Sequence, residues 1–133
     1  ATPADLARLP TLALGNSPDA ARWRLTGPAG ALAEVPLQPR LVVDDMGALL
    51  CAALAGVGCA ALPRLMVHGP LTRGDLQEVL PGWAPQPGVV QAAFASRQGV
   101  RPAVRQLLDA LAADFEQLAR EGRCLQAPAG RAG

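Results

Sequence analysis

The amino-acid sequence predicts an α/β fold, in which helices flank a sheet. Three observations support this prediction. Residues 41–63 read as strand, helix and strand, residues 22–37 alternate around a glycine and proline turn as a hairpin does, and residues 102–118 carry a helical apolar stripe. A chain of 133 residues is long enough to bury a hydrophobic core as one domain without disulfides or metals.

The stretch 41–63 is the centre of the predicted fold. Its first apolar run ends at Asp44 and Asp45, an almost wholly apolar segment follows at 46–55, and a second apolar run occupies 59–62. A carboxylate at the start of a helix accepts hydrogen bonds from free backbone N–H groups. Because the helix is apolar on every face, we expect it to be buried, with the strands on either side of it paired in parallel.

The remaining elements follow from turn formers and apolar spacing. We expect a short helix at 2–9, a buried strand at 11–14, a helical turn at 64–71, a loop at 83–88, and strands at 76–80 and 89–95. The last helix begins at Pro102 and ends at Gly122. Its apolar stripe needs a cover, which is either the sheet of this chain or a partner outside it. The stripe consists of Val104, Leu107, Leu108, Leu111, Phe115 and Leu118.

Composition narrows the class of protein. The net charge is +1, and nothing forms the basic surface that nucleic-acid binding requires. No apolar run is long enough to span a bilayer, and the first residues lack the pattern of a signal peptide, so we expect a soluble protein with no membrane partner. Three cysteines without a Cys-x-x-Cys pair favour a reducing compartment. The first residue is not Met, which indicates a fragment.

The acid pair Asp44 and Asp45 is the sharpest polar feature. The pair stands where open α/β sheets bind ligands, after a strand and before a helix. Acid–base catalysis or metal binding would need a third group, which the sequence does not place nearby. One acid capping the helix and the other facing its positive end is the simpler interpretation, and we favour it over catalysis. Lining a binding cleft is compatible with capping.

The remaining chemistry is sparse, so we expect no enzyme, no metal and no cofactor. His68 has no ligand at metal spacing, and neither Ser17 nor Ser96 lies in a Gly-x-Ser-x-Gly elbow. The Gly56-x-Gly58 pair follows a helix instead of preceding one, which is the wrong order for a phosphate loop. The turn 15–17 is different, because its backbone N–H groups could hold a small ligand. An ordinary surface turn is an equal alternative there.

The sequence resembles the C-terminal half of a LysR-type transcriptional regulator. Four segments, taken in order, carry this resemblance: WRLTGPAG, LVVDDMGALLCAALAGVGCAALP, LTRGDLQEVLPGW and RPAVRQLLDAL. The resemblance implies a three-layer α/β lobe with flanking helices, like lobe two of the type 2 periplasmic binding proteins. Residues 1–95 would form this effector-binding lobe. Residues 96–121 would be a C-terminal helix returning toward a missing lobe one, and residues 122–133 a flexible tail.

The same resemblance implies a function. A small-molecule effector would lie between the lobes, and the module would form a homodimer or tetramer through the helix at 46–55. DNA would be bound only by an N-terminal winged helix-turn-helix absent from this chain, in a cytoplasmic protein. The residues that would touch the effector are Gly15, Asn16, Ser17, Val43, Asp44, Asp45 and Met46.

Three alternatives stay open beside this interpretation. The chain could belong to a solute-binding protein of the same fold, or be a dimerisation fragment that binds no ligand. A hydrolase using the two acids comes last. One departure from the resemblance concerns the ligand, because helix starts favour anions and this helix starts with two acids. A simple carboxylate effector is therefore less obvious at this position.

Overall fold

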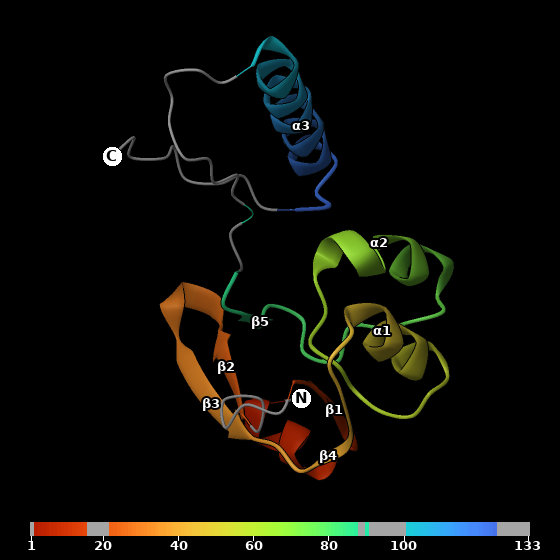
Figure 1. Cartoon of the computed structure of the whole chain (residues 1–133). Coiled ribbons are helices and arrows are strands. Elements are labelled where there is room, and N and C mark those ends of the chain that lie inside the picture. Colours follow the sequence, from red (N-terminus) through yellow and green to blue (C-terminus); the bar gives the residue numbers. More distant parts are fainter. Residues whose placement is uncertain (1, 16–21, 88–89, 91–100, 125–133) are drawn as a thin grey trace. The chain divides into compact units, whose positions relative to one another are not determined.

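The computed structural model describes residues 2–15, 22–87, 90 and 101–124 (Figure 1). The chain divides into two compact units, Ala1–Gln86 and Pro87–Gly133, which are treated separately below. The first unit ends within the predicted segment 1–95, and the boundaries predicted at 95 and 121 remain predictions. In order, the elements are η1 (Pro3–Arg8), β1 (Thr11–Leu14), β2 (Arg22–Thr26), η3 (Pro28–Gly30), β3 (Leu32–Pro36), β4 (Pro39–Val43), α1 (Met46–Leu54), α2 (Arg64–Arg73), β5 (Ala84–Pro85) and α3 (Pro102–Arg120).

The first unit contains a parallel strand pair. β1 pairs with β4, and a single parallel bridge joins Thr11 of β1 to Cys59. The predicted strand before the helix and the helix itself are therefore confirmed, but the strand expected at 59–62 is reduced to one bridge. The two flanking runs also do not pair with each other, because β1 lies between them. Leu12 and Ala13 of β1 are buried, as expected for a strand with a neighbour on each side.

Helix α1 begins and ends where the sequence predicts. Asp45 is its N-cap, and Gly56 beyond its end has a positive φ of 72°, the left-handed conformation that favours glycine. Its expected burial is wrong for this chain, however. Leu49 is buried against the sheet, whereas Cys51 and Leu54 are exposed. A narrow sheet covers one face of the helix and leaves the opposite apolar face open.

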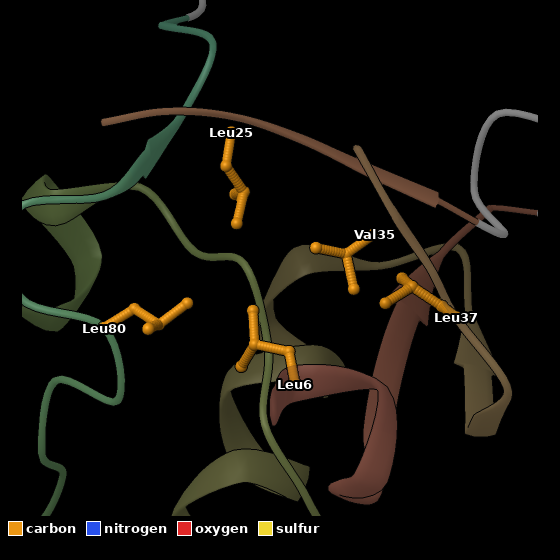
Figure 2. Packing of buried hydrophobic residues seen from close by; sticks show 5 residues of the cluster. All are labelled: Leu6, Leu25, Val35, Leu37 and Leu80. Carbon is orange, nitrogen blue, oxygen red and sulfur yellow. The ribbon is translucent and has the colours of Figure 1, made fainter. Parts of the chain in front are cut away.

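The predicted hairpin is confirmed and carries the main core. β2 and β3 pair antiparallel from Arg22↔Pro36 to Thr26↔Leu32, and β5 pairs with the other edge of β2. Beneath the hairpin, η1 and the segment before β5 contribute to a cluster that we call the hairpin core (Figure 2). It consists of Leu6, Leu25, Val35, Leu37 and Leu80, with Trp23, Val79 and Trp83 packed against it.

Two predictions for the segment after α2 are wrong. The strand expected at 76–80 does not form, because Val79 and Leu80 pack into the hairpin core from irregular backbone. The loop expected at 83–88 contains β5, which is two residues long. The strand expected at 89–95 lies outside the described residues except for Val90, which is in no strand.

Both later helices are confirmed. α2 is longer than the predicted turn and tolerates Pro70 inside it, and α3 begins at Pro102 with Gly122 (φ 69°) just beyond its end. No residue of α3 is buried, and its apolar stripe includes exposed Val104, Leu107 and Leu111. Within the described ranges, none of the helices combines the length and apolarity needed to cross a membrane.

Candidate functional site

The structure places Gly15, from one of the two segments predicted to form a site, beside Val43 from the other. Because β1 and β4 run parallel, their carboxyl ends meet at one edge, where Leu14 pairs with Val43. Just beyond β1, the N–H of Gly15 donates to the carbonyl oxygen of Val43 at 2.6 Å. Asn16 and Ser17 lie outside the described residues. Gly15 therefore lies directly beside the end of β4.

The two acids that follow β4 have different environments. Asp45 accepts a hydrogen bond from the N–H of Ala48 at 2.7 Å through Oδ1, and its own carbonyl accepts from the N–H of Leu49 at 3.1 Å. Asp44 is exposed and has no hydrogen-bond or ion-pair partner among the described residues. The capping interpretation thus holds for Asp45, while Asp44 takes no part in the cap among the described residues.

The rest of this edge is partly apolar. Val43 and Met46 are half-buried on either side of the acids. Gly47 lies close to the capping carboxylate, since a Cβ built there would be 3.1 Å from Oδ1 of Asp45. The positive end of α1 already faces the carboxylate of Asp45, so the edge carries negative charge beside the half-buried Val43 and Met46. Such an edge favours a ligand with a hydrogen-bond donor or a positive group.

Within the described ranges, no three of His, Cys, Asp and Glu gather as a metal site would require. His68 lies half-buried in α2, where its carbonyl accepts from Oγ1 of Thr72 at 2.8 Å. The three cysteines are free, and burial raises the pKa of the Cys59 thiol. Cys51 is exposed on the open face of α1.

A shallow apolar groove of about 430 Å³ lies between η1 and β3, away from the acid pair. The carboxylate on it, Glu34, already pairs with Arg22 at 2.6 Å. Sequence reasoning missed this groove because its small side chains come from two separate segments and share no motif. It is lined by Pro3, Ala4, Ala7, Ala33, Glu34, Val35 and Pro36.

Residues 1–116 match the family model described as the LysR substrate binding domain. The chain belongs to this family. The resemblance found in the sequence is therefore confirmed, and so is the effector-binding domain of a LysR-type transcription regulator as its class. No curated protein matches the chain.

Solved structures of LysR-type AphB share the fold. The regulatory domain of AphB in Vibrio vulnificus has a TM-score of 0.55 at 21% identity, covering 62% of this chain and 40% of that chain. The same domain treated with cumene hydroperoxide gives 0.57 at 18% identity, covering 82% and 53%. A full-length AphB variant gives 0.53 at 22%, covering 62% and 27%. The chain thus spans about half, or less, of each neighbour.

Proposed function

We propose that this chain is part of the effector-sensing and oligomerisation module of a bacterial LysR-type regulator. The effector would bind at the joint carboxyl edge of β1 and β4. The observation that carries this proposal is the parallel pairing that sets Gly15 against Val43, immediately before the acid pair, in a chain of this family. DNA binding would belong to a winged helix-turn-helix outside this chain, in a cytoplasmic protein.

The carboxyl edge of β1 and β4 connects directly to helix α1, and this connection provides a way to transmit ligand binding to the helix. Asp45 belongs to the edge and is also the N-cap of α1, so a ligand that moves the edge also moves the helix. The exposed apolar face of α1, with Cys51 and Leu54, is where a second copy would pack. An effector can shift the equilibrium between two arrangements of the edge and α1 only if it binds one arrangement more tightly than the other. Each tenfold difference in affinity corresponds to about 1.4 kcal/mol.

The charge of the edge narrows the effector class. The carboxylate of Asp44 is unpartnered among the described residues, and that of Asp45 already occupies the start of α1. A simple anion placed here would meet like charge. The effector that fits this edge therefore presents a neutral donor or a cationic group to it, and any acidic group of the effector would face another part of the cleft.

A thermal-shift screen of small metabolites on the full-length protein tests the binding site. We expect a hit to raise the melting temperature of the parent protein and to lose most of that effect in Asp44→Asn. Glu78→Gln is the matched control, because Glu78 is also an exposed acid without a partner among the described residues. The sensing proposal fails if no compound moves the melting temperature and the full-length protein remains monomeric.

The exposed face of α1 also favours a second candidate, a dimerisation fragment that binds no ligand. Light scattering on Leu54→Glu tests the interface, with Leu32→Glu as the control because Leu32 is exposed on the hairpin. Loss of the oligomer in the first variant alone would support pairing through α1. Retained oligomers together with no ligand response in the screen would favour the second candidate over the first.

A further inference from the structure

The chain leaves the first unit through a weak attachment. β5 pairs with β2 at Thr26↔Ala84 and Leu25↔Pro85, and both residues of β5 are exposed. Pro85 has no backbone N–H to donate to this ladder. The unit ends one residue later, at Gln86. The backbone hydrogen bonds between β5 and β2 therefore attach the end of the first unit only weakly.

The residue before β5 makes a much closer contact. The ring of Trp83 lies against Gly27, where a Cβ would come within 2.7 Å of ring atoms Cδ2 and Cε2. Gly27 has φ −108° and ψ −169°, an extended conformation that any residue adopts. The ring of Trp83, and not the backbone conformation, is therefore what requires a glycine at this position.

A tight turn connects Leu80 of the hairpin core to Trp83 and orients the ring toward Gly27. The N–H of Trp83 donates to the carbonyl of Leu80 at 3.1 Å, and Gly82 between them has φ 84°. Proline followed by a glycine of positive φ is typical of a type II turn, here formed by Pro81 and Gly82. Leu80 itself is buried in the hairpin core (Figure 2). The turn thus connects a fixed core residue to the ring, and the ring to β5.

We propose that Trp83 seated on Gly27 is a latch that holds β5 on β2. When the ring lifts, β5 and the exit of the chain are released while the hairpin core stays folded. The regulatory use of the latch rests on the proposed function, because a sensing module needs a connection that can change direction. The latch itself is a property of the first unit and operates without any effector.

The substitution Gly27→Ala in the full chain tests the latch, because the added methyl group occupies the position of the ring. The reporter is Trp83 fluorescence in a Trp23→Phe background, since the chain has two tryptophans. We expect a red-shifted emission, and hydrogen exchange at Ala84 faster by about tenfold or more. Exchange at Leu25 and Val35 should stay slow. Gly69→Ala in α2 is the control, because its nearest neighbour is the flexible end of Arg73.

Two further measurements keep the test decisive. If Trp23→Phe unfolds the chain, exchange at Ala84 in Gly27→Ala alone reports the same release. In a Trp83→Leu background, Gly27→Ala should add no further increase in exchange, because the ring that it displaces is gone. Unchanged exchange at Ala84 in Gly27→Ala, or an equal increase at Val35, would overturn the latch. Neither result depends on whether an effector exists, so the proposed function would be unaffected.

Discussion

The hairpin core and helix α3 both have an apolar pattern, but only the hairpin core buries its apolar side chains. Leu25 and Val35 in the hairpin core are 4% and 3% exposed, whereas Leu107 and Leu111 on the stripe of α3 are 57% and 44% exposed. Both regions have the spacing that their secondary structure requires. An apolar pattern thus identifies the face that needs a partner, but another segment must be present to bury it. For α3, we propose that the cover is a lobe outside this chain, as the family resemblance implies.

The largest expected difference comes from the same truncation in both regions. Leu25→Ala should lower the free energy of unfolding by about 2–5 kcal/mol, because it leaves a cavity in a packed core. Leu107→Ala should change it by less than about 0.5 kcal/mol, because the side chain is exposed. Denaturant unfolding followed by circular dichroism and by tryptophan fluorescence measures both. An equal loss in Leu107→Ala would mean that α3 is packed in solution.

Helix α1 is buried on one face and exposed on the other, so it is intermediate between the hairpin core and α3. Substitutions of the two acids at its start distinguish effects on stability from effects on binding. Asp45→Ala should cost about 1 kcal/mol, because the N–H of Ala48 loses its acceptor. Asp45→Ser should recover most of this loss, and Asp44→Ala should leave stability unchanged. Thermal unfolding of the three variants checks the order. A larger loss from Asp44→Ala would show that the capping role has been assigned to the wrong acid.

The buried hydroxyl of Thr11 provides a test of hydrogen bonding within the first unit. Thr11 is 1% exposed, and its hydroxyl has no hydrogen-bond partner in the described part of the chain. Thr11→Val keeps the shape and removes the unpaired hydroxyl, so the free energy of unfolding should rise by up to about 1 kcal/mol. Urea unfolding measures the change. Destabilisation instead would indicate that the hydroxyl has a partner in solution.

The smallest effect should be an acid dependence at the start of the first unit. The backbone N–H of Thr2 at 2.7 Å, and then its hydroxyl at 3.0 Å, hold the pKa of Asp5 below its ordinary value of 3.8. A lowered pKa stabilises the fold above the unfolded-state pKa, and this stabilisation is lost as the pH falls through the folded-state value. Asp5→Asn should therefore be slightly less stable than the parent at neutral pH and equal to it in strong acid, as thermal unfolding at both values would show.

Local signals predicted most of the elements. The periodic stripe predicted α3, turn residues predicted the hairpin, and the acid pair with the Gly56-x-Gly58 pair predicted the ends of α1. The errors arose where tertiary contacts decide. Val79 and Leu80 look like a strand but pack from irregular backbone, and β5 could not be expected because it is a two-residue strand that contains Pro85. The order of strands around β1 is also set by packing.

The candidate site was predicted in the same uneven way. Residue type and position predicted that one of the two acids caps the helix, and the structure identifies Asp45 as that acid. The juxtaposition of Gly15 with Val43 depends on which strands are neighbours, which periodicity does not reveal and which the family resemblance implied. The groove between η1 and β3 has no local signal, since it is formed by small side chains far apart in the sequence.

The unequal exposure of Cys51 and Cys59 makes α1 accessible to thiol chemistry. Cys51 is exposed on the open face of the helix, while burial raises the pKa of Cys59 and so lowers its thiolate fraction at neutral pH. A maleimide dye added in limited amount should therefore label Cys51 ahead of Cys59. Attached there, the dye would report on the helix face at which a second copy is proposed to pack.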